Sequence, residues 1–456
     1  MRVNIFSGYF RFLLSPLAFL ASALLFQSCV DHDSFLHPPL PGNECAPNFQ
    51  YGYTNKVSYF PFEKITAFLQ STENIDLCRL TIYDIQGNAS FSVASPLTVQ
   101  NIATDNPSSK GFGFQPTIEF DLPPGIKSGI YLIENKIPFI VKTDEFVDLL
   151  IVYPSNTANA YSDSGGKSLY TTPVSERPAI VSFQRPIPLQ NLSTFCLRWF
   201  NTLDQVSIGY IADRDMDDYA EISHAKILII PGHNEYWTRA ARNNFDQFVS
   251  SGKHAILLSG NTMWWQVRYT PTGEGLICYQ DEAKDPETNP LLKTITWDKS
   301  LLDYPIISSI GADFNRGGYG MRTDNGWNGY KVVSPDSPLL KNTGLTKGSI
   351  ISCPSQEYDG APIHSFDSDG LPIVDNEVLN FEKIELIAYD KGFRIQETTG
   401  TFLVFQRTKT SGIIVNTGST DWCGENGMGG LSSEKIKTIT GNAIRGLLEN
   451  ENLFSN

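Results

Sequence analysis

Residues 225–237 read AKILIIPGHNEYW, a nearly continuous apolar run that ends in a polar turn. Ala225–Ile230 has the length and composition of a strand that is buried on both faces, as in a parallel sheet. Residues 238–250 (TRAARNNFDQFVS) place apolar side chains on one face of a helix that Thr238 can cap. A second apolar run, Ala255–Leu258, follows. Strand, helix and strand within about 35 residues predict a βαβ unit.

Similar runs occur on both sides of this unit. Residues 146–152 (FVDLLIV) predict another buried strand, and Phe402–Phe405 and Gly412–Asn416 predict two more. A last helix is expected over about 433–449. Residues 271–400 are rich in Gly, Pro and Asn, and we expect long excursions over the sheet there. The pattern predicts fold class α/β, with an open, mostly parallel sheet over residues 144–456.

The segment over residues 48–143 has a different character. Residues 77–84 (LCRLTIYD) and 117–122 (TIEFDL) alternate between apolar and polar side chains, and turn residues follow each run. Short strands without helical periodicity between them are typical of an immunoglobulin-like β-sandwich. We therefore expect a β-sandwich domain over 48–143, preceded by a polar, Pro-containing tether over 29–47.

The first 28 residues have the pattern of an export signal. Residues 12–26 (FLLSPLAFLASALLF) form an apolar stretch behind Arg2 and Arg11, too short for the roughly 20 residues that span a bilayer. The sequence LFQSC at 25–29 resembles a bacterial lipoprotein cleavage box, which predicts a signal peptide over 1–28 and a lipid on Cys29. We expect an exported protein that is lipid-anchored to the outer membrane of a bacterial envelope. Ordinary secretion and a retained anchor are the alternatives.

Composition excludes several classes of protein. The chain has 456 residues, of which 41% are hydrophobic, so it can fill a core and is not a disordered or collagen-like protein. With 35 Lys and Arg against 49 Asp and Glu, its net charge is -14, and no long basic run offers a nucleic-acid surface. Export permits disulfides, but six cysteines allow 15 pairings, and the sequence does not choose among them; these are Cys45, Cys78, Cys196, Cys278, Cys353 and Cys423.

Polar segments follow the predicted strands, and groups at the carboxyl ends of such strands often bind ligands. PGHNEYW contains His233 and Glu235, a pair that can serve as base, acid or metal ligand. SGNTMWW contains Asn261, which can donate a hydrogen bond to a carbonyl or an oxyanion. AYSDSGGKSLY contains Tyr161, and GSTDW contains Asp421. The alternative for each segment is an ordinary polar turn or a buried aromatic side chain.

Two common enzyme signatures are absent from the sequence. There is no GxSxG elbow and no Cys at a predicted strand-to-helix turn, so serine or thiol acyl transfer is not supported. Gly-Lys-Ser at 166–168 lacks the first Gly of a phosphate-binding loop, which excludes nucleotide binding by that motif.

AYSDSGGKSLY, PGHNEYW, SGNTMWWQVR and GSTDW occur in this order, and the combination resembles the C-terminal region of the N,N-dimethylformamidase large (beta) subunit and its relatives. The resemblance covers about residues 50–450. It implies a class I glutamine amidotransferase-like or flavodoxin-like α/β domain beside a β-sandwich. It also implies an iron-dependent amidohydrolase that cleaves the C–N bond of a small amide.

The same resemblance implies a mononuclear, non-haem iron, Fe(III), held by Tyr131, Tyr161 and Glu235. Three anionic oxygen donors favour a hard cation, which can polarise an amide carbonyl and activate water. The resemblance also places His233 and Asn261 around the substrate and Asp421 at the position of an active-site acid, so we expect these three residues to be catalytic.

One position departs from the family pattern. The segment CYQD places Gln280 where the family tends to have Lys, which removes a cation from the site. This departure supports the alternative function, a non-catalytic surface binding lipoprotein that keeps the fold.

Overall fold

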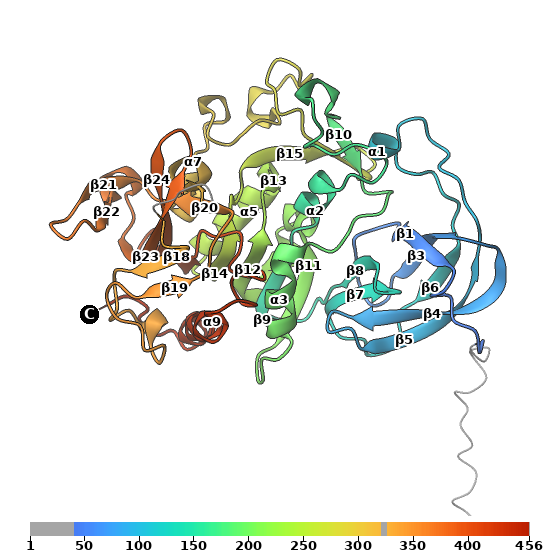
Figure 1. The fold of residues 1–456 in the computed structure, drawn as a ribbon, viewed down its shortest axis with the longest axis horizontal. Helices are drawn as coiled ribbons and strands as arrows, with labels where there is room; N and C mark the ends of the chain where they lie inside the picture. The colour runs from blue at the N-terminus through green and yellow to red at the C-terminus, as the bar shows by residue number, and fades with distance from the viewer. Residues whose placement is uncertain (1–40, 321–325, 456) are drawn as a thin grey trace, which may run out of the picture.

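The computed structural model describes residues 41–320 and 326–455. The predicted signal peptide, Cys29 and most of the tether lie outside the described residues. In Figure 1, the blue strands of the N-terminal part stand beside a larger sheet that is coloured from green to red. Within the described ranges, no helix is both long enough and apolar enough to cross a membrane.

Two sheets near the N-terminus share one apolar core. Alternation along one strand, IDLCRLTIYD, directs Leu80 and Ile82 into this core, where Ile65 and Leu69 of the other sheet also lie. This is the two-layer packing of a β-sandwich. The predicted domain limits, residues 48–143 and 144–456, stay a prediction. One sheet contains β1 (Phe49–Thr54), β3 (Lys64–Ser71) and β6 (Ile118–Asp121); the other contains β2 (Ser58–Tyr59), β4 (Ile75–Asp84), β5 (Ala89–Leu97), β7 (Gly129–Ile133) and β8 (Ile137–Val141).

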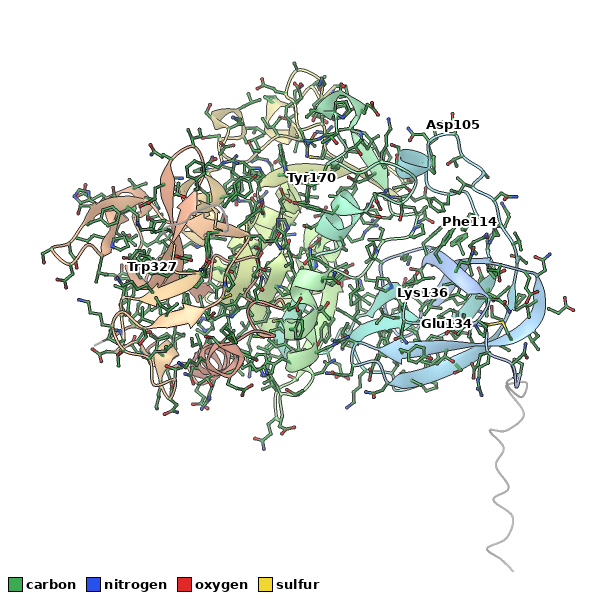
Figure 2. The ribbon with its side chains drawn as sticks, viewed as in Figure 1. Asp105, Phe114, Glu134, Lys136, Tyr170 and Trp327 are labelled. Atoms are coloured by element: carbon green, nitrogen blue, oxygen red, sulfur yellow. A yellow bond between two sulfur atoms is a disulfide. The ribbon has the colours of Figure 1, made fainter. Side chains whose placement is uncertain are left out.

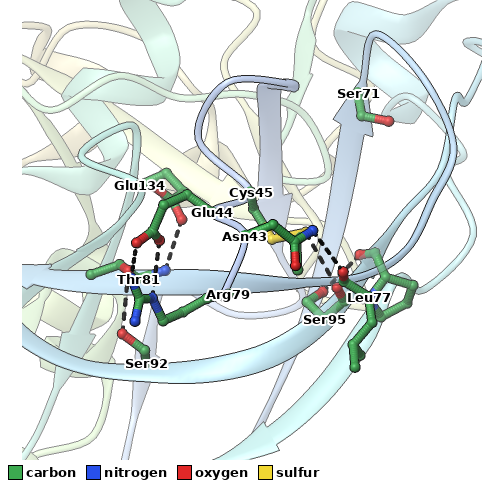
Figure 3. The surroundings of a disulfide bond; sticks show 12 residues. Asn43, Glu44, Cys45, Ser71, Leu77, Arg79, Thr81, Ser92, Ser95 and Glu134 are labelled. Atoms are coloured by element: carbon green, nitrogen blue, oxygen red, sulfur yellow. Dashed lines mark hydrogen bonds and ion pairs between the residues drawn. A yellow bond between two sulfur atoms is a disulfide. The ribbon is translucent and has the colours of Figure 1, made fainter. Parts of the chain in front are cut away.

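A disulfide joins Cys45, before β1, to Cys78 in β4 (Figure 3). Arg79 beside it forms an ion pair with Glu44. The structure therefore supplies one pairing that the sequence left open. The other cysteines in the described residues are buried free thiols, namely Cys196, Cys278, Cys353 and Cys423.

The largest sheet combines parallel and antiparallel strands. Parallel pairing joins β11, β9, β12, β14 and β25 in that spatial order, and antiparallel pairing continues from β25 through β24 and β23 to β17 and β20. Its members are β9 (Val147–Tyr153), β11 (Ile208–Ala212), β12 (Ala225–His233), β14 (His254–Gly260), β17 (Gly318–Tyr319), β18 (Gly329–Val332), β19 (Ile350–Ser352), β20 (Glu357–Gly360), β23 (Lys383–Phe393), β24 (Glu397–Gln406) and β25 (Ile413–Asn416).

Smaller elements surround this sheet. The short strands are β10 (Ile180–Ser182), β13 (Tyr236–Thr238), β15 (Trp265–Tyr269), β16 (Gly275–Ile277), β21 (Ile363–Phe366) and β22 (Pro372–Val374). The helices are α1 (Pro107–Lys110), α2 (Ser155–Tyr161), α3 (Asn191–Phe200), α4 (Ala220–Ser223), α5 (Arg239–Ser250), α6 (Ile306–Ile310), α7 (Phe314–Gly317), α8 (Asn376–Leu379) and α9 (Ser433–Leu448).

Strand β12 is buried on both faces because a helix layer covers each one. Leu228 belongs to the apolar cluster that contains Phe245 of α5. Its neighbour Ile229 points the other way, into the cluster that contains Leu197 of α3 and Ile439 of α9. Successive side chains of a strand point to opposite faces, so a strand covered on both sides is apolar at nearly every position. This explains the continuous run that the sequence shows.

The local predictions around β12 are confirmed. Thr238 precedes α5, and its Oγ1 accepts a hydrogen bond from the Ala241 amide, as an N-cap residue should. The apolar run Ala255–Leu258 lies within β14, and the predicted last helix is α9.

The predicted fold class is wrong. An open, mostly parallel sheet of the class I glutamine amidotransferase-like or flavodoxin-like kind is not present: the described chain is 34% strand and 20% helix, arranged in several mixed sheets. Parallel pairing stops at β25, and β17, β20 and β23 come from the region 271–400 that the sequence assigned to excursions. Strands as short as the two residues of β17 carry little periodic signal, so their pairing was not visible in the sequence.

Candidate functional site

The carboxyl ends of four neighbouring parallel strands carry the polar residues of the site. Tyr161 ends helix α2, which begins two residues after β9. His233 ends β12, Glu235 follows it, and Asn261 comes directly after β14. Asp421 lies in the loop after β25. Because parallel strands end at the same edge of a sheet, residues far apart in the chain meet there.

Two tyrosines meet the carboxylate of Glu235. The Tyr161 hydroxyl donates a hydrogen bond to Glu235 Oε2 at 3.1 Å. The Tyr170 hydroxyl lies 2.7 Å from Oε1 and 2.8 Å from Oε2. The two rings stack with their centroids 4.1 Å apart, and Tyr170, which Figure 2 labels near α2, also accepts a hydrogen bond from Tyr236 at 2.9 Å. Glu235 is itself buried, and its amide donates to Thr157 Oγ1. Three oxygen-bearing side chains therefore converge at one point.

Tyr131 does not belong to this group. It lies in β7, in the core between the two N-terminal sheets, where its ring stacks on Phe139 and its hydroxyl donates to the Lys127 carbonyl oxygen. The structure therefore does not bring Tyr131 to Tyr161 and Glu235: the phenol that accompanies Tyr161 at Glu235 is Tyr170. The hydroxyl of Tyr131 instead forms its hydrogen bond with the turn that precedes β7.

Burial controls the charges of the three converging groups. Burial first, and then the negative charge of Glu357, raises the pKa of Glu235 to about 8, although hydrogen bonds from Tyr170 and Tyr161 oppose the rise. Burial and the charge of Glu235 raise the pKa values of both phenols well above 10.0. Without a cation, the Glu235 carboxyl and the two phenols therefore favour their protonated forms near pH 7. A bound cation favours the deprotonated forms instead, because it binds the deprotonated oxygens.

His233 lies beside the carboxylates with an unused ring nitrogen. Its Nε2 is 3.4 Å from Glu235 Oε2 and 3.3 Å from Glu357 Oε2, yet within the described part of the chain it makes no hydrogen bond. Burial lowers the pKa of His233 to about 4, and the charge of Asp421 opposes the shift. The imidazole is therefore neutral near pH 7, and its Nε2 can accept a proton.

Two glycines allow the strand ends to approach each other. Gly232 has a φ of 73°, and a Cβ there would lie 2.7 Å from Gln190 Oε1, the atom that accepts the His233 amide hydrogen. A Cβ on Gly260 would lie 2.5 Å from the Thr420 nitrogen. Any larger residue would push α3 or the loop after β25 away from the site.

Asn261 and Asp421 support the side chains of Glu357 and His233. Asn261 Nδ2 donates to Glu357 Oε2 at 3.1 Å, and its Oδ1 is a buried atom with no hydrogen-bond partner among the described residues. Asp421 accepts hydrogen bonds from the Gln356 amide at 2.8 Å and from Asn426 at 2.9 Å. Asn261 can therefore orient Glu357 directly, whereas Asp421 acts on His233 through its charge.

A cleft of about 480 Å³ opens onto this group, and Tyr161, His233 and Glu357 all contribute to its wall. Tyr161 exposes 43% of its surface, so its ring faces the cleft while its hydroxyl lies against Glu235. A small molecule in the cleft can contact Tyr161, His233 and Glu357, whereas Tyr170 and Glu235 lie behind them and do not line the cleft.

The donor set fits a hard cation. Within residues 41–320 and 326–455, no group of three or more His, Cys, Asp or Glu side chains is arranged to hold a metal ion. The candidate set here is of another kind: two phenols, Tyr161 and Tyr170, with the carboxylate of Glu235. Oxygen donors that become anionic on binding match a hard, highly charged ion.

Although Gln280 is uncharged, it holds the cation of Arg177 near the site. Gln280 Oε1 accepts a hydrogen bond from Arg177 Nη1 at 3.0 Å. The guanidinium of Arg177 lies 5.7 Å from the centroid of the Tyr170 ring, in the range of a cation–π contact. Gln280 therefore holds a positive charge beside Tyr170 that comes from another segment.

The fold and the site together define a class of protein: a large mixed sheet with a buried group of two phenols, a carboxylate and an imidazole at the ends of its parallel strands. The family model described as N,N-dimethylformamidase beta subunit-like, C-terminal, matches residues 74–430, and the chain belongs to this family. The resemblance drawn from the four sequence motifs is thereby confirmed. The family is named after a subunit of an amide hydrolase.

No curated protein matches the chain. Among solved structures, the chain is similar to a thua-like protein from Bacteroides uniformis, with 13% identity, a TM-score of 0.36, and coverage of 67% of this chain and 93% of that one.

The sequence analysis did not identify Tyr170 or Glu357 as site residues. Tyr170 ends the motif AYSDSGGKSLY, so a signal existed: a second Tyr on the far side of the same Gly-containing turn. Glu357 begins β20, in the antiparallel half of the sheet, and no motif marks it. Only the pairing of that half with the rest of the sheet brings Glu357 to His233.

Proposed function

We propose that this protein hydrolyses the C–N bond of an amide at a site where Tyr161, Tyr170 and Glu235 hold one ferric ion. The observation that carries the proposal is the contact of both phenol hydroxyls with one buried carboxylate, at 3.1 Å and at 2.7 Å. Family membership supports the reaction class, because the family is named after an amide hydrolase subunit. The overall reaction adds water across the C–N bond and yields a carboxylic acid and an amine.

When bound, a ferric ion would supply Lewis-acid polarisation of the amide carbonyl and would make water easier to deprotonate. The protein contributes the proton transfers. His233 Nε2 is neutral and makes no hydrogen bond within the described residues, so it can take a proton from the attacking water. Glu357, 3.3 Å away, stabilises the imidazolium that results. The same proton can then pass to the departing nitrogen, which leaves as a neutral amine.

Asn261 and Asp421 would orient the groups that react. Asn261 does not line the cleft, so it acts through its Nδ2, which donates to Glu357 and keeps that carboxylate in place. The charge of Asp421 favours protonated His233 during the transfer. Asp421 acts through His233, so it is a positioning residue.

Iron loading tests the ligand set. Ferric iron bound by tyrosinate gives a visible charge-transfer band, so iron-reconstituted wild type should be coloured and should release dimethylamine and formate from N,N-dimethylformamide, the probe amide. Tyr170→Phe should lose most of the band and most of the activity. Tyr131→Phe is the matched control and should keep both, because its hydroxyl donates to the Lys127 carbonyl oxygen and not to Glu235.

The alternative function, a non-catalytic surface binding lipoprotein, would be supported if wild type stays colourless, metal-free and inactive after reconstitution. Loss of the band in Tyr131→Phe with retention in Tyr170→Phe would show that the proposed ligand set is wrong.

We also propose that the protein is exported and lipid-anchored through Cys29. The apolar stretch 12–26 and the LFQSC sequence support this proposal, and the Cys45–Cys78 disulfide is typical of an oxidising compartment. Cys29→Ser should move the protein from the membrane fraction to the soluble fraction of the cells that express it. Unchanged partitioning would exclude the lipid anchor.

A further inference from the structure

We infer that the substrate of this site is an uncharged amide that carries an apolar substituent longer than a methyl group. The inference rests on the proposed function and concerns only which amide is used. It follows from the size of the cleft, from its apolar wall and from the sign of its charges.

The cleft is larger than the smallest amides need. N,N-dimethylformamide has five non-hydrogen atoms, which occupy on the order of 150 Å³ if each takes the roughly 30 Å³ of a water molecule. The cleft holds about 480 Å³, within the range of pockets that bind larger organic ligands. Space therefore remains beyond the reacting group.

One wall of that space is apolar. Ala158 of α2 contributes to it, together with Pro188 and Leu189, which precede α3, and Leu192 in the first turn of α3. Leu192 is only half-buried and Pro188 is exposed, so both present apolar surface that a ligand can cover. Each methylene that leaves water against this wall should strengthen binding about threefold to fourfold.

The charges along the cleft are negative. Asp163 and Glu357 line it, and among the described lining residues there is no Lys or Arg. Arg177 lies beside Tyr170, and neither of these two residues lines the cleft. Arg185 interacts with Asp163, but it is buried, donates to main-chain carbonyls such as that of Asn159, and does not line the cleft. A substrate that carries a carboxylate would meet repulsion from like charges, which should lower kcat/KM at least about tenfold.

A panel of matched amides tests the inference. Iron-reconstituted wild type is assayed with N,N-dimethylformamide, N-butylformamide, pentanamide and 4-formamidobutanoate, so that the apolar group lies on the nitrogen or on the carbonyl and the last compound adds a carboxylate. We expect N-butylformamide, pentanamide or both to exceed N,N-dimethylformamide in kcat/KM by tenfold or more. We expect kcat/KM for 4-formamidobutanoate to be at least tenfold lower than kcat/KM for N-butylformamide.

The two possible failures are distinguishable. Hydrolysis of N,N-dimethylformamide with no gain for the butyl compounds, or with equal use of the carboxylate compound, overturns this inference and leaves the proposed function intact. No hydrolysis of any amide by iron-loaded protein overturns the proposed function.

Variants of the wall supply a second readout that does not depend on turnover. Calorimetric binding of N-butylformamide to metal-free protein should weaken about tenfold in Leu192→Gln. Leu77→Gln is the matched control, because Leu77 is half-exposed on β4, away from the cleft. Equal affinities in both variants would show that Leu192 does not contact the substituent.

The charge of the cleft can be altered at an exposed position. Gln356 lines the cleft and is exposed, so Gln356→Lys adds a cation without opening the core. In this variant, the ratio of kcat/KM for N-butylformamide to kcat/KM for 4-formamidobutanoate should be at least threefold smaller than in wild type. An unchanged ratio would show that electrostatic repulsion does not exclude the anion.

Discussion

Replacing Glu235 with Gln should stabilise the metal-free protein at alkaline pH, although it removes a proposed ligand. Burial and Glu357 raise the pKa of Glu235 from 4.5 to about 8 in the folded protein. Each pKa unit corresponds to about 1.4 kcal/mol, so ionised Glu235 costs the fully buried site on the order of 4–5 kcal/mol. Gln has nearly the shape of protonated Glu and accepts hydrogen bonds from the same tyrosines, but it never ionises.

The pH dependence follows from proton counting. Between pH 4.5 and about 8 the folded state holds the Glu235 proton and the unfolded state does not, so the wild type loses stability as pH rises through this window. The stabilising contribution is complete below pH 4.5 and is gone above about pH 8. The difference between Glu235→Gln and wild type should therefore grow from near zero at pH 4.5 to several kcal/mol at pH 9.

Urea unfolding of chelator-treated protein, followed by tryptophan fluorescence between pH 4.5 and pH 9, measures this difference. Glu73→Gln, at an exposed position, is the control and should differ from wild type by a constant small amount. Ferric iron should reverse the order, because it stabilises only a protein that binds it. A Glu235→Gln difference that stays constant over the whole pH range would refute the raised pKa and the charge balance built on it.

Three further predictions test the catalytic histidine and the scaffold. In the iron-loaded enzyme, His233→Gln should lower kcat 10²- to 10⁴-fold with a smaller change in KM, measured by steady-state release of amine; an unchanged kcat would remove His233 from the proton transfers. Replacing Cys45 and Cys78 with Ala together should lower the free energy of unfolding by about 3–4 kcal/mol in urea, because the disulfide closes a loop of 33 residues; a loss below about 1 kcal/mol would contradict this chain-entropy argument. Thr238→Ala should cost about 1 kcal/mol in thermal or urea unfolding, since it removes the hydrogen bond to the Ala241 amide; Thr238→Ser should retain most of it, and equal losses in both would exclude the cap.

Local pattern was sufficient for the centre of the sheet and for helices α5 and α9. The apolar runs in β9, β12 and β14 and the helical spacing in α5 could be recognised within short windows, because burial on both faces leaves a local signature. The short strands β17 and β20 have no such signature, and their antiparallel pairing overturned the predicted fold class.

By itself, the sequence determined the family, the buried parallel strands, and the strand-end positions of His233, Glu235, Asn261 and Tyr161, since each depends on neighbouring residues and their order. Only the tertiary structure decided which side chains meet. It joined Tyr170 to Glu235 across 65 positions and brought Glu357 to His233, and it placed Tyr131 in a different core. The physical reason is that a contact between distant segments depends on strand pairing and on the close approaches allowed by Gly232 and Gly260. Neither can be recognised from the sequence around the residues that make the contact.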